Sequence, residues 1–365
     1  MTTHETSVAA ASGPADFERY GLDPTRIAQW EDGARTDDRP GTYEWWYFDA
    51  HLADGSKLVV VFMNKDIVTP NRPLSPILRL DLDLPDGRSF HKVLSFPPEE
   101  WSAARDRADV RIGANRFHGD LHEYRIQATA DNVSVDVTLV GHIPPWRPAT
   151  GHMLFGAKRE LEFAWLPSVP QGTVTGSYVV DGVTTSVTGV GYHDHNWGNV
   201  GLTKIIHNWY WARGQAGPFS VIASYITAVE KYGYESIPVF MLARDGRIVA
   251  DDASMVRFET EGEYLDGVTG KPVASVTRYL FTHDEDEVAV TFRRERDLVR
   301  ARMTDELPRA KRVLARLARF DGAYHRFAGP MTITVYKAGQ QVEEYTDDAI
   351  WELMYFGHAR RPAAS

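Results

Sequence analysis

The chain has 365 residues, of which 43% are hydrophobic and 12% aromatic, with a formal net charge of −10 and an isoelectric point near 5.7. This acidic balance argues against a nucleic-acid partner, which normally meets a basic face, and the absence of cysteine excludes disulfides and a cysteine nucleophile. Since no apolar run approaches the length of a spanning helix and the N-terminus does not resemble a signal peptide, we expect a cytoplasmic protein without stable membrane insertion.

Residues 1–20 are expected to form a flexible tail, and beyond them the hydrophobic period is close to two almost everywhere. Strands are predicted over 57–62, 133–140, 173–180, 219–226, 273–281, 288–292 and 331–336. Turn signals separate them at 54–55, 86–87, 181–182, 245–246 and 338–339. Many strands, hairpin turns and few helices predict an all-β protein built as an antiparallel barrel or sandwich.

One weak internal repeat divides the chain. An aromatic strand at 44–48, a tight turn and an apolar strand open the first half, and the same order returns from residue 208. We therefore expect two β-domains of similar design, 21–200 and 201–365. One helix is predicted at 305–319, where acidic residues come early, basic residues late and apolar residues follow helical spacing.

The segment 189–199, Gly-Val-Gly-Tyr-His-Asp-His-Asn-Trp-Gly-Asn, holds the densest polar cluster of the chain. Its β-branched flank predicts a strand, on which Tyr192, Asp194 and Asn196 point to one face while His193, His195 and Trp197 point to the other. Whichever face looks inward buries several polar groups, which must be paired with one another or with a ligand. The cluster is therefore either a structural hydrogen-bond network or a functional site.

Several chemistries lack their motifs. His193 and His195 would suit two metal ligands, but no glutamate follows at the expected spacing, so we expect no metal. The nucleophile elbow, phosphate loop and dinucleotide fingerprint are absent, and we expect no cofactor. What remains is chemistry by His, Asp, Tyr and Trp, which can exchange protons near neutral pH and stabilise cations on aromatic faces.

From about residue 40 to 357 the chain resembles the hydroxyneurosporene synthase (carotenoid 1,2-hydratase) and AttH superfamily. The resemblance rests on these segments: Glu44-Trp45-Trp46-Tyr47, Trp165-Leu166-Pro167, Gly172-Thr173-Val174-Thr175-Gly176, Gly191-Tyr192-His193-Asp194-His195-Asn196-Trp197-Gly198, Asn208-Trp209-Tyr210-Trp211, Trp351-Glu352 and Tyr355-Phe356-Gly357. It implies two lipocalin-like antiparallel β-barrels packed together. Members include carotenoid hydratases and cofactor-free pericyclases that close decalin-type rings.

The resemblance also implies roles for residues. In the hydratases, residues matching His195 and Trp197 are thought to be catalytic, with a downstream Tyr-x-Asp that here reads Tyr225-Ile226-Thr227. Protonating an unactivated alkene needs a strong acid, so the threonine weakens the hydratase interpretation. A pericyclic reaction needs only a folded substrate and a hydrogen bond to its carbonyl.

We therefore predict a cofactor-free cyclase, a Diels-Alderase-like pericyclase acting on a hydrophobic polyene of polyketide or terpenoid biosynthesis. Alternatives are a hydratase adding water to a carotenoid or isoprenoid C=C bond and a lipocalin-type binder without catalysis. The predicted partner is a hydrophobic small molecule, and the oligomeric state stays open. The predicted catalytic residues are His193, His195, Trp197 and Tyr225, and the predicted substrate-binding residues are Trp45, Trp46, Tyr192, Asn196, Trp209 and Trp211.

Overall fold

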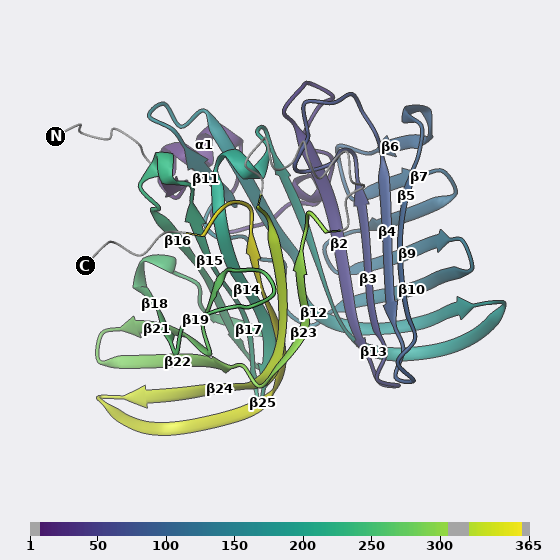
Figure 1. Ribbon diagram of the computed structural model, residues 1–365. Coiled ribbons are helices and arrows are strands. Elements are labelled where there is room, and N and C mark those ends of the chain that lie inside the picture. Colours follow the sequence, from purple (N-terminus) through teal and green to yellow (C-terminus); the bar gives the residue numbers. More distant parts are fainter. Residues whose placement is uncertain (1–7, 306–320, 360–365) are drawn as a thin grey trace. The chain divides into compact units, whose positions relative to one another are not determined.

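The computed structural model describes residues 8–305 and 321–359, and antiparallel strands make up most of both ranges (Figure 1). The chain divides into two compact units. Of the described residues, 9–201 form the N-terminal unit, and 202–305 and 321–359, with residue 8, form the C-terminal unit. The predicted all-β fold class is confirmed, and each unit is described here by itself. No helix in the described ranges has the length and apolar character needed to cross a membrane.

The N-terminal unit is one sheet in the order β5-β4-β3-β2-β13-β12-β10-β9-β8-β7-β6, with β1 paired to β11 and β11 to β12. Its strands are β1 (Val8–Ala10), β2 (Tyr43–Leu52), β3 (Lys57–Met63), β4 (Ile77–Asp83), β5 (Ser89–Ser95), β6 (Trp101–Ala103), β7 (Asp109–Ile112), β8 (Asn115–Gly119), β9 (Glu123–Ala130), β10 (Val133–Gly141), β11 (His152–Phe155), β12 (Leu161–Val180) and β13 (Val183–Gly198). Two 3-10 turns, η1 (Gln29–Asp32) and η2 (Pro98–Glu100), complete it.

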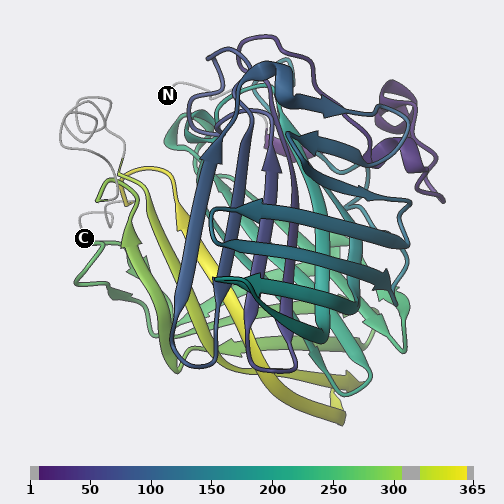
Figure 2. The same ribbon diagram turned by 90° about the vertical axis from the view of Figure 1, so that its right-hand side faces the viewer.

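The sheet of the N-terminal unit curls so that strands from its two halves face each other across one core, with β8–β10 crossing β2–β4 (Figure 2). Alternate side chains of the strands enter this core, as on β10, where buried and half-buried positions alternate over residues 133–140. Leu80, Phe62, Phe117 and Ile126 are each 0% exposed. Closing the sheet over one packed core buries its apolar face.

The prediction of a flexible tail over residues 1–20 is wrong for residues 8–20. Residues 8–20 form β1 and helix α1 (Pro14–Tyr20), which starts with proline in its first turn and ends at Gly21 in a left-handed conformation. Tyr20 stacks on His152 with ring centroids 3.6 Å apart, and its hydroxyl donates to Glu162 at 3.2 Å. The segment is therefore tied to β11 and β12.

The C-terminal unit has the sheet order β17-β16-β15-β14-β25-β24-β22-β21-β18, with β23 paired to β24 and a separate β19-β20 pair. Its strands are β14 (Ile206–Ala216), β15 (Phe219–Ala228), β16 (Ser236–Arg244), β17 (Arg247–Ala250), β18 (Val256–Glu261), β19 (Tyr264–Leu265), β20 (Pro272–Val273), β21 (Val276–His283), β22 (Asp286–Arg293), β23 (Arg296–Arg302), β24 (Ala323–Lys337) and β25 (Gln340–Tyr355), with 3-10 turns η3 (Leu202–Lys204), η4 (Glu230–Tyr232) and η5 (Ala253–Met255). The helix predicted at 305–319 lies outside the described residues, apart from Asp305.

The two units repeat one topology. In the first, β2 lies between β3 and β13, and β12 and β10 follow; in the second, β14 lies between β15 and β25, and β24 and β22 follow. The two aromatic segments noticed in the sequence are therefore the corresponding strands β2 and β14. This agreement supports the expectation of two β-domains of similar design.

Candidate functional site

Strand β13 carries the polar cluster and lies between β2 and β12 in the middle of the N-terminal sheet. His193 pairs with Phe48 and His195 with Trp46, two core residues of β2. Because cross-strand partners share a face, both histidines point into the core, whereas Tyr192, Asp194 and Asn196 point to the outer face. The alternation expected from the sequence is present, and both faces are buried.

The inner face is organised around Asp32 at the end of η1. Its Oδ2 atom accepts the Tyr124 hydroxyl and lies 3.1 Å from His193 Nε2. Its Oδ1 atom lies 3.3 Å from His195 Nδ1, an ion-pair distance without hydrogen-bond alignment. All four side chains are at most 1% exposed.

Glu44 completes this inner network at the other side of His195. Its Oε1 atom lies 2.8 Å from His195 Nε2 and also accepts the backbone N–H of Arg35. The Thr36 hydroxyl donates to the other carboxylate oxygen at 2.7 Å. The Trp46 ring stacks on His195 with centroids 4.2 Å apart, so the imidazole is held on its edge and on its face.

Charge explains why this network is stable inside a core. Burial alone would lower the pKa of His195, but contacts with Asp32 and Glu44 outweigh burial and raise it. Burial would raise the pKa of Asp32, but the two histidines lower it well below its usual range. His193 Nδ1 donates to the Tyr47 carbonyl at 2.8 Å. Two carboxylates therefore face two imidazoles, and each charge has a partner.

The outer face carries a second cluster, centred on Asp194. Its Oδ2 atom accepts the Tyr192 hydroxyl at 2.8 Å and Trp165 Nε1 at 2.8 Å, and its Oδ1 atom accepts Asn196 Nδ2 at 2.7 Å. Burial raises the pKa of the Asp194 carboxyl to about 6, although the hydrogen bonds from Tyr192 and Trp165 oppose the shift. Trp45, half-buried on β2, lies opposite Asn196 in the register.

The predicted residues of the C-terminal unit divide between two faces. Trp209 and Trp211 are half-buried on one face of β14, and Trp209 Nε1 donates to Glu352 at 3.4 Å. Tyr225 on β15 pairs with Tyr210 on the opposite face, toward the core, and stacks on Phe258 with centroids 4.3 Å apart. The sheet therefore does not bring Tyr225 together with the two tryptophans.

The structure brings the other predicted residues together in two groups. His193, His195, Trp46 and Trp197 share the inner face, where Trp197 lies against Ala164 and Leu166 and tilts over His195 at 4.8 Å. Tyr192, Asn196 and Trp45 share the outer face. No His, Asp and Glu side chains of the described residues are grouped so that three could hold a metal ion.

Sequence reasoning missed Asp32 and Tyr124, which anchor the inner network. Asp32 ends a 3-10 turn 161 residues before His193, and nothing in its local pattern marks it as a partner. Trp165 was noticed only as part of a motif. Its spacing from β13 gives no sign that its indole N–H would reach Asp194.

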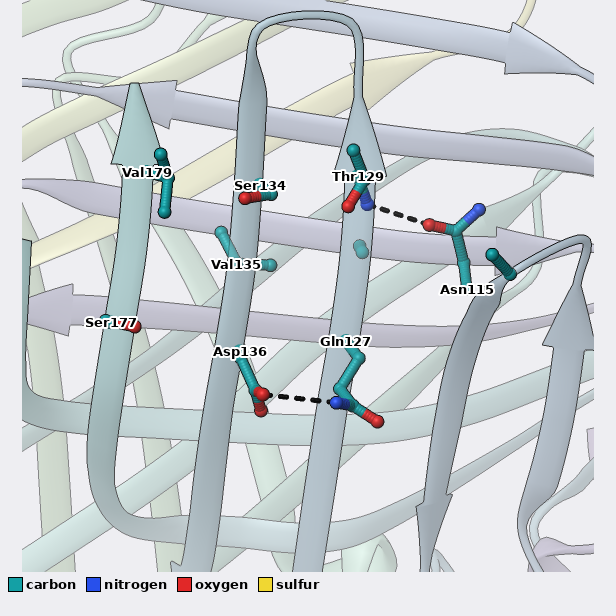
Figure 3. A pocket seen from close by; sticks show the side chains of 10 residues that line it. Asn115, Gln127, Thr129, Ser134, Val135, Asp136, Ser177 and Val179 are labelled. Atoms are coloured by element: carbon teal, nitrogen blue, oxygen red, sulfur yellow. Dashed lines mark hydrogen bonds between the residues drawn. The ribbon is translucent and has the colours of Figure 1, made fainter. Parts of the chain in front are cut away.

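A polar hollow of about 270 Å³ lies on the outside of β9, β10 and β12 (Figure 3). Gln127, Thr129, Ser134, Asp136 and Ser177 are among its lining residues, and the Gln127 amide donates to Asp136 at 3.1 Å. None of the predicted site residues lines this hollow. It is a shallow surface feature, separate from both clusters on β13.

Fold and site together define an all-β protein of two lipocalin-like antiparallel units, with buried polar clusters on both faces of one central strand. The model of the Diels-Alderase-like family matches residues 39–266, more than half of the chain. The chain belongs to this family. The resemblance seen in the sequence, to a superfamily that includes pericyclases, is confirmed.

Several relatives and solved structures are similar to this chain. The quinolone epoxide rearrangement protein asqO of Emericella nidulans is 27% identical over 195 residues, 50% of this chain and 53% of that protein. The quinolone epoxide rearrangement protein penF of Penicillium thymicola is 27% identical over 289 residues, 71% and 76%. This chain thus spans about half the length of asqO and three quarters of penF.

The solved structures show the fold. The crystal structure of CghA with Sch210972 has a TM-score of 0.60 at 14% identity, covering 96% of this chain and 99% of that one. A putative AttH from Nitrosomonas europaea has a TM-score of 0.59 at 17% identity, covering 95% and 100%. The lipocalin-like architecture therefore extends over nearly the whole chain.

Proposed function

We propose that the protein is a cofactor-independent cyclase that folds a hydrophobic polyene of polyketide or terpenoid origin into a reactive conformation and closes a ring. Membership of the Diels-Alderase-like family carries this proposal. Relatives named for epoxide rearrangement and a neighbour solved with a small molecule support the same class of work. Such catalysis needs positioned aromatic walls and a few hydrogen-bond donors.

The geometry favours different roles for the two faces of β13. His193 and His195 are 0% exposed and held by charged partners, an arrangement that supports a role in holding β13 in place. Trp45, Trp209 and Trp211 are half-buried and can supply aromatic surface. A direct catalytic role for His193, His195, Trp197 and Tyr225 stays a prediction.

Turnover tests the proposal directly. The purified protein is incubated with linear polyenes bearing a diene and an activated alkene, in water enriched in oxygen-18, and the products are followed by mass spectrometry. A cyclase gives a new product of unchanged mass. A product that gains one labelled water would instead identify a hydratase, and release of every bound polyene unchanged would identify a carrier.

A further inference from the structure

The carboxylates of Asp194 and Asp32 differ in the groups that contact them. Asp32 lies between two histidines, whereas the hydrogen-bond donors to Asp194 are uncharged: a phenol, an indole and an amide. Three donors from two strands thus converge on one buried carboxylate, whose residue is 6% exposed. Such a group fixes the orientation of each donor that it holds.

Among the three donors, Asn196 is the one whose side-chain orientation matters most, because its amide also carries an acceptor oxygen. An ionised carboxylate only accepts hydrogen bonds, so the amide nitrogen of Asn196 must face Asp194 and the amide oxygen must face away. Within the described ranges no hydrogen-bond donor contacts this oxygen, and Asn196 as a whole is 4% exposed. The Asn196 amide oxygen can therefore accept a hydrogen bond from a ligand.

Aromatic surface lies beside this acceptor. Trp45 is the cross-strand partner of Asn196, and its ring stacks near Tyr43 and Phe163 with centroids 5.8 Å and 6.0 Å away. A polar acceptor next to half-buried aromatic rings suits a ligand with an apolar chain and a hydrogen-bonding head.

We propose that Asp194 is a positioning residue that locks the Asn196 amide, so that its oxygen accepts a hydrogen bond from an N–H or O–H head group of an apolar substrate lying over Trp45. The inference rests on the proposed function for the idea that this substrate is the polyene. It adds a selectivity rule: head groups that can donate a hydrogen bond are preferred.

Protonation of Asp194 should release the lock, because a carboxylic acid can donate as well as accept and no longer dictates the amide orientation. Burial raises the pKa of this carboxyl to about 6. Among the described residues, the titratable groups near it include Tyr192 and His193 on β13 and Tyr47 and Asp49 on β2. The preference for donor heads should therefore weaken as the pH falls through about 6.

Two fluorescent probes with the same conjugated tetraene chain test this. The primary amide of cis-parinaric acid has donor hydrogens on its head, and the methyl ester has none. We expect the full-length protein at pH 7.5 to bind the amide about five- to tenfold more tightly, the effect of one hydrogen bond. Asn196→Ala should bind both probes equally, and the wild-type preference should fade below pH 6.

Gln127→Ala is the matched control, since Gln127 is also an amide that donates to a carboxylate, in the outer hollow of the same unit (Figure 3). It should keep the full preference. Tyr192→Phe keeps the test decisive if Asn196→Ala does not fold. It removes one donor that favours the ionised carboxyl, so the midpoint of the pH dependence should move upward.

Four results would overturn the inference: no binding of either probe, equal affinity of the wild type for both, loss of the preference in Gln127→Ala but not in Asn196→Ala, or an unchanged midpoint in Tyr192→Phe. None of these measurements requires turnover. If the probes are discriminated as expected and no polyene is cyclised, the proposed function fails and the binding rule stands.

Discussion

At the residue scale, the inner network shows how an acidic protein keeps four ionisable side chains inside a β-core. Asp32 and Glu44 lie on either side of His195, and Asp32 also meets His193. Burying any one of these charges alone would cost several kcal/mol, so they are stable there only as a set. The network therefore ties η1 and β2 to β13.

This arrangement makes stability depend on pH through His195. Its pKa is raised in the folded state, so its contribution is complete below the unfolded value of about 6.5 and is lost as the pH rises through the folded value. We expect His195→Gln to be less stable than the wild type, with the largest gap at pH 5–6 and a smaller one at higher pH. Urea unfolding from pH 5 to 9 measures the gap.

The pH-dependent part of this difference in the free energy of unfolding should amount to about 1.4 kcal/mol for each unit by which folding raises the pKa of His195. The lowered pKa of Asp32 acts in the opposite direction, because its contribution is lost only as the pH falls below its unfolded value of about 3.9, outside the range measured. His91→Gln, at a histidine whose side chain is 61% exposed, is the control and should change stability little. A gap for His195→Gln that is constant with pH would contradict the expectation.

At the element scale, β13 is constrained by its backbone as well as by its side chains. A Cβ added at Gly191 would lie 2.5 Å from Val174 Cγ2 and 2.9 Å from the Asp49 carbonyl oxygen. The strand therefore approaches both neighbours more closely at this point than a side chain allows, immediately before the polar cluster. Glycine at this position therefore lets β13 pack closely against β12 and β2 just before Tyr192 and His193.

We expect Gly191→Ala to lower the free energy of unfolding by about 1–3 kcal/mol, because the methyl group overpacks the sheet. Chemical denaturation monitored by circular dichroism measures the loss. Gly267→Ala is the control, since nothing lies within 4 Å of its Cβ, and it should cost at most about 0.5 kcal/mol. Equal stability of the two variants would show that β13 can shift without cost.

Elements were predictable where local chemistry determines them. The hairpins at 181–182, 245–246 and 338–339 have positive φ at both turn residues, as the sequence signals require. The strand predicted over 273–281 is instead divided into β20 and β21. Between them, Ala274 N donates to the Tyr210 hydroxyl and Ser275 N to the Glu261 carbonyl, partners that local periodicity does not reveal.

At the scale of the whole molecule, the same strand order occurs twice, and each unit has its own apolar core. The inner network also lies wholly within the N-terminal unit. We propose that the two units are separate domains, close to the predicted 21–200 and 201–365. The N-terminal domain then begins near residue 9 because α1 contacts β11 and β12.

A fragment of residues 9–201 tests this division. We expect it to fold alone, with a β-type circular dichroism spectrum and one cooperative urea transition, because its core and its charged network need no residue from outside it. A fragment of residues 21–201, which lacks α1, is the matched comparison and should unfold at lower urea. Failure of the longer fragment to show a cooperative transition would argue against independent domains.

The sequence alone determined the fold class, the hairpins and the alternation of β13, since these depend on local periodicity and turn chemistry. It also pointed to the polar cluster, because whichever face of this strand turns inward buries several polar groups that need partners. Only the tertiary structure decided how they are used. Asp32, Tyr124 and Trp165 reach the cluster from distant segments, and their charges and hydrogen bonds separate an ion-paired inner face from an outer face that offers an acceptor.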